Sequence, residues 1–202
     1  MIKQIEAYEP YNEQEARDKE IILSMLTEAE RMGEDIFSRE NRMAHMTASA
    51  WVVNCERTKV LLAYHNIYDS WAWLGGHADG ERNLLSVAVR EVCEESGLTP
   101  AHVRPAWLIS QKGDLSQGSA GDIFSLEVLA VGGHFKKGEY ISSHLHLNVT
   151  YLLESDEEET LYKKEDENSS VKWFLPEEAL AVSSEPWFAE HIYRKLNEKA
   201  GL

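Results

Sequence analysis

The chain has 202 residues, of which 43% are hydrophobic and 27% are charged, so it is long enough for a globular domain with a buried core. Its formal net charge of -15 argues against nonspecific binding to nucleic acid or to an anionic membrane, and no apolar run approaches the length of a membrane span. The two cysteines give no disulfide framework and the N-terminus lacks a signal-peptide pattern, so we expect a cytoplasmic protein.

The first 43 residues are predicted to form a helical extension. Asn12, with Glu15 three residues later, predicts the start of a helix, and Gly33 predicts its end. Apolar residues recur between them at helical spacing. We therefore expect two regions, an extension over 1–43 and a domain over 44–202.

Strands and helices alternate irregularly in the second region, which argues against a doubly wound parallel sheet. A mixed sheet with helices on both faces, an α+β fold, is the architecture that this order predicts. The predicted elements, in chain order, are strands 47–54 and 58–65 as a hairpin, strand 71–74, a helix ending at Gly97, strand 103–111, a Gly/Ser loop 112–121, strands 123–131 and 140–153 joined by a turn at 136–138, an acidic loop 154–169, strand 170–175, and helices 176–181 and 186–199.

The segment 76–98, GHADGERNLLSVAVREVCEESGL, is the most informative part of the chain. Leu85, Ala88, Val89 and Val92 follow helical spacing and predict an apolar stripe that packs on the core.

Three carboxylates of the same helix, Glu91, Glu94 and Glu95, are three or four residues apart and are predicted to share an outward face. Carboxylates about 5 Å apart repel each other by roughly 3 kcal/mol per pair at an effective dielectric constant of 20. Such a patch has to be solvated, paired with arginine or bridged by a cation. Hard oxygen ligands in this number suit Mg²⁺ or Mn²⁺.

At these residues the sequence resembles the Nudix hydrolases. The family motif is a Gly, five residues, a Glu, seven residues, and then Arg-Glu-apolar-x-Glu-Glu-x-Gly-apolar. One position departs from it, because Arg82 stands where the first Glu is expected and Glu81 lies one place early. The residues in register with the motif are Gly76, Arg90, Glu91, Val92, Glu94, Glu95, Gly97 and Leu98.

The resemblance implies an α/β/α sandwich over 44–202 and a metal-dependent pyrophosphohydrolase that cleaves a diphosphate linkage in a small molecule. It implies that Arg90 orients a carboxylate, and many relatives are homodimers. The sequence leaves the general base open: Glu91 is the candidate that it names directly, and Glu127 and Glu139 are remote alternatives. The implied ligands of Mg²⁺ or Mn²⁺ are the carbonyl oxygen of Gly76 and the carboxylates of Glu91, Glu94 and Glu95.

Histidines suggest a second metal site. His144 and His146 are two residues apart on a predicted strand, so both rings point to the same face. The segments 44–51 and 75–77 resemble type 1 isopentenyl-diphosphate isomerase, in which histidines at the places of His45 and His77 bind a metal. Four imidazoles would suit Zn²⁺ or Ni²⁺ better than Mg²⁺.

Two alternatives to hydrolysis stay open. One is an enzyme like that isomerase, although its reactive cysteine corresponds to Gly75, its acidic proton donor corresponds to His146, and a further ligand histidine is missing near Ser38. The other is a Nudix-fold binding module without catalysis, which the departure at Arg82 leaves open.

Overall fold

The structure is a computed structural model that describes residues 1–66, 69–106, 121–136, 138–164 and 168–202. The predicted Gly/Ser loop, the second half of strand 103–111 and the middle of the turn at 136–138 fall largely outside these residues. Two compact units make up the chain. Unit 1 consists of Met1–Ala48, Gly76–Val87 and Ile123–Thr150, and unit 2 consists of Ser49–Gly75, Ala88–Asp122 and Tyr151–Leu202.

Unit 1 begins with two helices, α1 (Ile2–Ala7) and α2 (Glu13–Met32), which confirm the predicted helical extension. The side chain of Asn12 caps α2 by accepting a hydrogen bond from the backbone N–H of Glu15 at 2.9 Å. Gly33 ends the helix in the left-handed conformation, with a φ of 70°. The start and the end of α2 are therefore those that the sequence predicts.

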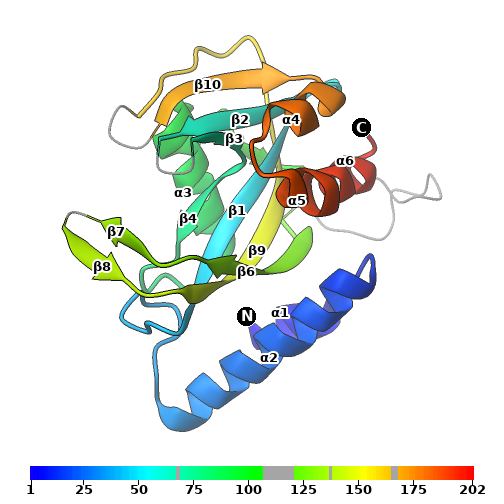
Figure 1. Cartoon of the computed structure of the whole chain (residues 1–202). Coiled ribbons are helices and arrows are strands. Elements are labelled where there is room, and N and C mark those ends of the chain that lie inside the picture. The colour runs from blue at the N-terminus through cyan, green and yellow to red at the C-terminus, as the bar shows by residue number, and fades with distance from the viewer. Residues whose placement is uncertain (67–68, 107–120, 137, 165–167) are drawn as a thin grey trace. The chain divides into compact units, whose positions relative to one another are not determined.

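Helix α2 lies along strand β6 (Ser125–Val131), as Figure 1 shows. The carboxylate of Asp18 accepts a hydrogen bond from the backbone N–H of Val128 at 3.0 Å. Gln14 donates to the backbone carbonyl of Leu126 at 3.4 Å. Side chains of the helix thus satisfy backbone groups of β6, although the boundary at residue 43 between an extension and a domain stays a prediction.

A buried polar network joins α2 to β6. Glu15 is fully buried, and its carboxylate accepts hydrogen bonds from the Tyr8 hydroxyl at 2.5 Å, the Tyr11 backbone N–H at 2.8 Å and the Ser125 hydroxyl at 2.6 Å. The Ser125 hydroxyl also contacts Glu127, which is fully buried too. Burial and the nearby Glu15 carboxylate raise the pKa of Tyr8, so its hydroxyl stays protonated and donates.

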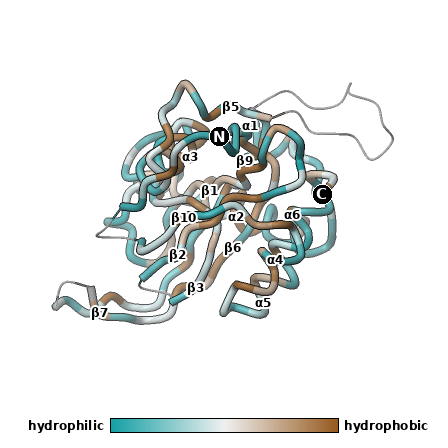
Figure 2. Tube along the Cα trace, turned by 90° about the horizontal axis from the view of Figure 1, so that it is seen from above, coloured by the Kyte–Doolittle hydropathy of each residue, from teal (hydrophilic) through white to brown (hydrophobic). Residues whose placement is uncertain are grey.

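Strand β9 (His144–Ser155) pairs antiparallel with β6, and a small hairpin, β7 (His134–Lys136) and β8 (Glu139–Ile141), precedes it. We predicted one strand over 140–153, and this was wrong, because the chain breaks at Ser142 and Ser143 between β8 and β9. Figure 2 shows hydrophobic and hydrophilic stretches alternating along the hairpin. Its aromatic side chains, Phe135 and Tyr140, are exposed.

In unit 2 the predicted hairpin is confirmed, because Val53 of β1 (Ala44–Asn54) pairs antiparallel with Val60 of β2 (Val60–His65). The other edge of β2 pairs antiparallel with β10 (Asn168–Phe174). Strand β3 (Ser70–Ala72) also pairs with β2, and β5 (Arg104–Pro105) pairs with β9. Strand β4 (Leu74–His77) follows β3, so the predicted strand 71–74 is in fact two short strands.

Helix α3 (Leu84–Ser96) is the predicted carboxylate helix, and with the strands it makes the fold α+β, as predicted. Unit 2 ends in α4 (Pro176–Val182), α5 (Pro186–Phe188), a π-helical turn η1 (Ala189–Tyr193) and α6 (Arg194–Ala200). The predicted helix 186–199 is thus interrupted by a π turn. Among the described residues, no helix is long and apolar enough to cross a membrane.

Candidate functional site

The face that α3 buries differs from the predicted one by one residue. Leu84, Ala88 and Val92 are fully buried, whereas the predicted stripe began at Leu85. Because Glu95 lies three residues after Val92, it falls on this buried face, and only 2% of the residue is exposed. The expectation that all three carboxylates share an outward face was therefore wrong for Glu95.

Hydrogen bonds hold the buried Glu95 in place. Its carboxylate accepts from the backbone N–H of Gly75 at 3.1 Å, and the Nε2 atom of His65 lies 3.9 Å from its other oxygen. The side-chain amide of Asn168 donates to the backbone carbonyl of Glu95 at 2.9 Å. These contacts supply the partners that a buried carboxyl group requires, and they hold Glu95 more firmly than a surface carboxylate.

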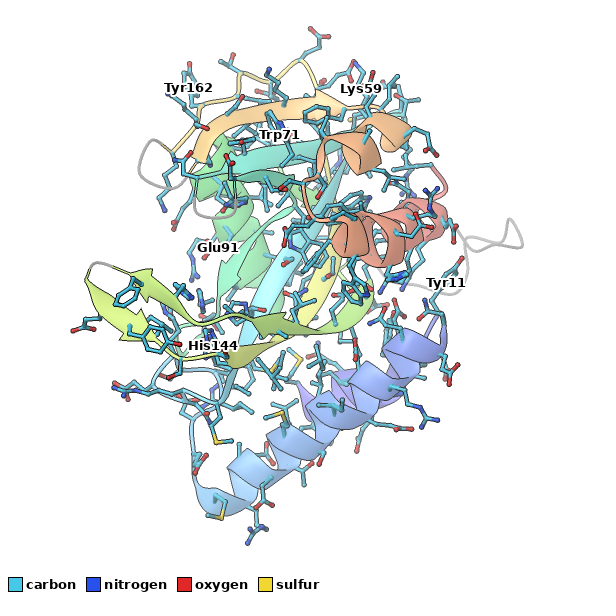
Figure 3. All side chains as sticks on the ribbon, in the orientation of Figure 1. Tyr11, Lys59, Trp71, Glu91, His144 and Tyr162 are labelled. Atoms are coloured by element: carbon cyan, nitrogen blue, oxygen red, sulfur yellow. The ribbon has the colours of Figure 1, made fainter. Side chains whose placement is uncertain are left out.

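Glu91, which Figure 3 labels on α3, and Glu94 reach solvent to different degrees, with 13% and 45% of their side chains exposed. The guanidinium group of Arg90 donates to Glu91 at 2.7 Å and lies 3.8 Å from Glu94. Arg90 therefore contacts both carboxylates, and its role in orienting one of them stays a prediction. The ammonium group of Lys164 lies 3.0 Å from the other oxygen of Glu94.

The carboxylates fit Mg²⁺ or Mn²⁺ in the chemistry of their donors. All are hard oxygens, and each contacts an N–H or cationic group of the protein. Among the described residues, the ligand atoms of Glu91, Glu94 and Glu95 do not all come within 4.8 Å of one another. Gly76, the other predicted ligand, belongs to unit 1.

Arg82, which stands where the motif has its first Glu, makes structural contacts within unit 1. Arg82 pairs with Asp35 at 3.0 Å and stacks over the ring of Phe37, 4.3 Å from its centroid. Glu81 accepts a hydrogen bond from the backbone N–H of Asn83 at 2.7 Å, just before α3 begins. Arg82 thus holds the segment after α2, while a metal role for Glu81 stays a prediction.

Replacing Arg82 with Ala is expected to lower stability without affecting metal binding. The exposed ion pair and the cation–π contact together contribute about 0.5–1 kcal/mol, and a guanidinium group has no lone pair to offer a metal. Urea unfolding and Mn²⁺ titration of the Arg82→Ala variant check both halves of this prediction. A loss of Mn²⁺ affinity at unchanged stability would contradict it.

The four predicted histidines come together in unit 1. The ring of His45 lies 5.0 to 5.1 Å, between centroids, from the rings of His77, His144 and His146. The possible ligand atoms of His45, His144 and His146 lie within 4.8 Å of one another, and the Nε2 atoms of His144 and His146 are 3.2 Å apart. His77 has its ring 4.9 Å from that of His146 but is not part of this three-residue set.

The hydrogen bonds of the rings indicate which ring nitrogen carries the proton. The Nδ1 atoms of His45 and His144 lie 3.0 and 2.9 Å from the backbone carbonyls of Asn41 and Ser142. Since a carbonyl only accepts, Nδ1 carries the proton in both rings, and Nε2 of His144 therefore accepts the hydrogen bond from Nε2 of His146. Nε2 of the buried His45 has no hydrogen-bond partner in the described part of the chain.

The cluster is also electrostatically suited to a cation. Burial, followed by the charges of His77 and His45, lowers the pKa of His146 to about 2, and burial lowers the pKa of His45. Both rings are therefore neutral at pH 7, which is the form that binds a metal. His144, labelled in Figure 3, has a further imidazole nearby, because the ring of His134 on β7 lies 6.5 Å from it.

The two alternative general bases, Glu127 and Glu139, differ in their burial. Glu127 is fully buried and accepts hydrogen bonds from Asn148 at 3.0 Å and Thr150 at 2.8 Å, so it has a structural role in unit 1. Glu139 is exposed on the hairpin strand β8.

The sequence did not single out Lys164, His65 or Asn168, although a lysine pair inside the acidic run 154–169 was a signal that could have drawn attention to Lys164.

Comparison with known proteins decides the family. The family model described as NUDIX domain matches residues 43–196. The chain belongs to the NUDIX family. The predicted resemblance and the predicted enzyme class, a Nudix-type pyrophosphohydrolase, are thereby confirmed.

Solved structures of NUDIX proteins show the same fold. The MutT protein from Methanosarcina mazei Go1 is 15% identical, with 78% of this chain and 96% of that chain covered and a TM-score of 0.52. RenU, a Nudix hydrolase from M. smegmatis, is 15% identical, with 78% of this chain and 84% of that chain covered and a TM-score of 0.50. No curated protein sequence matches the chain. The α+β Nudix fold is thus confirmed.

Proposed function

We propose that this NUDIX protein hydrolyses a diphosphate linkage in a nucleoside diphosphate derivative or another small organic diphosphate, with Mg²⁺ or Mn²⁺ as cofactor. The observation that carries the proposal is the carboxylate face of α3, where Glu91 and Glu94 reach solvent and Arg90 contacts both. A divalent cation held there would neutralise phosphate charge and activate water.

The residues of the chain have distinct parts in this proposal. Glu91, which is mostly buried, and Glu94, which is exposed, are two of the proposed metal ligands, and Arg90 holds Glu91 in a fixed orientation. Glu95 completes the ligand set, and its hydrogen bond from Gly75 fixes the start of β4 relative to α3 within unit 2. The carbonyl oxygen of Gly76 is the fourth proposed ligand, and Glu91 is the proposed general base.

A panel of diphosphate compounds tests the proposal directly. Nucleoside triphosphates, dinucleotide polyphosphates, nucleotide sugars and small organic diphosphates are incubated with the protein and Mg²⁺, Mn²⁺ or EDTA, and released phosphate and nucleotide are measured. We expect turnover of at least one class that EDTA abolishes. Turnover that persists in EDTA would overturn the metal requirement, and the absence of turnover across the panel would favour a binding module.

An isomerase activity is not favoured by the residues. Gly75 stands where the reactive cysteine of the isomerase would be, and its backbone N–H is bonded to Glu95. His146, which takes the place of the acidic proton donor, is held neutral by burial. Product analysis with an isoprenoid diphosphate separates the two activities, because hydrolysis releases phosphate and isomerisation does not.

We also propose that the histidine cluster of unit 1 binds a transition metal such as Zn²⁺ or Ni²⁺. Its support is the set of three converging imidazoles, together with the buried and unpartnered Nε2 of His45 within the described residues. Three protein ligands leave a position open for a water or a substrate oxygen, as in catalytic zinc sites. His77 is the proposed fourth contact.

Replacing His45 with Ala is expected to weaken Zn²⁺ binding by about a hundredfold, because one of three imidazole ligands is lost. Isothermal titration with Zn²⁺ measures the effect, and anomalous scattering from a Zn²⁺-soaked crystal locates the ion. His191→Ala is the control, since His191 is an exposed histidine in unit 2. Equal Zn²⁺ affinity in both variants would show that the cluster is only a group of packed polar rings.

A further inference from the structure

A lysine from outside the motif lies on the carboxylate helix of unit 2. Lys164 follows the acidic part of the segment 154–164, and its ammonium group is 3.0 Å from Glu94. Only 28% of its side chain is exposed. In a chain with a net charge of -15, a half-buried cation beside the carboxylates requires a physical explanation.

The backbone on either side of Lys164 is tied to the C-terminal end of α3. Before it, the backbone N–H of Tyr162, which Figure 3 labels, donates to the carbonyl of Ser96 at 2.7 Å. At Gly97 the φ is 74°, and a Cβ added there would lie 2.7 Å from the Cβ of Tyr162, so the glycine allows this close approach.

After Lys164, the buried Asn168 completes the anchor. The backbone N–H of Lys164 donates to the side-chain oxygen of Asn168 at 3.0 Å, and the backbone N–H of Asn168 donates to the carbonyl of Lys164 at 2.8 Å. The side-chain amide of Asn168 in turn donates to the carbonyl of Glu95. The ammonium group of Lys164 therefore contacts Glu94 from a backbone that is held in place, unlike that of an ordinary surface lysine.

We propose that Lys164 is a substrate-binding residue that exchanges Glu94 for a phosphate oxygen of the bound diphosphate. This proposal rests on the proposed function, in which Glu94 is a metal ligand. Once Glu94 serves the metal, the ion pair between Lys164 and Glu94 is broken, but the backbone of Lys164 stays anchored beside the site. An ammonium group on a flexible stem is a suitable point charge for a phosphate oxygen.

The exchange has two measurable consequences. Without substrate, Lys164 competes with a cation for Glu94, so Lys164→Gln should bind Mn²⁺ about threefold more tightly. With Mg²⁺ present, the same variant should bind imidodiphosphate, a diphosphate that resists hydrolysis, about tenfold more weakly, because a charge-assisted hydrogen bond is lost. Lys164→Arg should retain most of both properties.

The matched control is Lys163→Gln, which makes the same change of charge one residue away. Isothermal titration of wild type and the three variants, with circular dichroism to verify folding, gives the result. If Lys164→Gln and Lys163→Gln bind imidodiphosphate equally well, Lys164 is only a surface ion pair and the proposal is wrong. If Lys164→Gln does not fold, Lys164→Arg decides, because binding weaker than in Lys163→Gln then contradicts the proposal.

Failure of the proposed function gives a different pattern. In that case wild type itself shows no metal-dependent turnover on the diphosphate panel and no Mn²⁺ binding that Glu94→Gln removes, and the assignment of Lys164 falls with it. Wild-type turnover together with unchanged imidodiphosphate binding in Lys164→Gln overturns the inference about Lys164 alone.

Discussion

The double variant Glu91→Gln, Glu94→Gln is expected to lose metal-dependent turnover by at least about a thousandfold, which corresponds to ~4 kcal/mol of transition-state stabilisation. A neutral amide keeps the shape of the carboxylate but supplies no negative charge to a divalent cation. The fold should be retained, since Gln keeps the size of Glu and the ion pairs that are lost involve Arg90, of whose side chain 41% is exposed. Initial rates with Mg²⁺ on a substrate from the panel provide the measurement.

Glu177→Gln on α4 is the matched control for this variant, because it makes the same chemical change on a helix of unit 2 where 84% of the side chain is exposed. Its turnover should equal that of wild type. Full activity in the double variant would contradict the assignment of the carboxylates as metal ligands. Glu95→Gln is less informative, because this carboxylate is buried and also holds Gly75.

The second large effect concerns stability. Replacing Glu15 with Ala is expected to lower the free energy of unfolding by about 3 kcal/mol, because the fully buried carboxylate leaves a cavity and three donors lose the acceptor that they share. These donors are the Tyr8 hydroxyl, the Tyr11 backbone N–H and the Ser125 hydroxyl. Urea unfolding followed by circular dichroism measures the change. An unchanged slope of the unfolding free energy against urea concentration would show that the variant exposes as much surface on unfolding as wild type does.

Glu13→Ala is the control for that prediction, since Glu13 lies in the same first turn of α2 but is exposed. It should change stability by less than about 0.5 kcal/mol. Equal effects of the two substitutions would mean that only the charge near the start of the helix matters, and that the buried network contributes nothing of its own.

Several local features could be predicted because they depend on neighbours in sequence. The cap at Asn12, the left-handed Gly33 and the Gly97 stop follow from short-range backbone rules, and all are seen in the structure. The hairpin of β1 and β2 follows from two apolar strands around a short polar turn. The family motif added the NUDIX assignment, which periodicity alone would not have given.

Other features depend on tertiary contacts that periodicity does not encode. A helix periodicity fixes the angle between side chains but not which part of a broad apolar face is covered, so Glu95 was assigned to solvent although it is buried. The contact of Lys164 with Glu94 joins residues 70 positions apart, which local rules cannot foresee. The histidine cluster could be predicted because His144 and His146 share a strand face and because the resemblance to the isomerase pointed to His45 and His77.

The side chains of α2 that bond to β6 have a consequence for assembly. Asp18 and Gln14 occupy a backbone N–H and a carbonyl that an edge strand would otherwise offer to a strand from another molecule. At these positions α2 therefore blocks strand addition, and β6 cannot pair with a strand of a second copy of the chain while the helix is in place. A homodimer of this chain would have to bury a different surface.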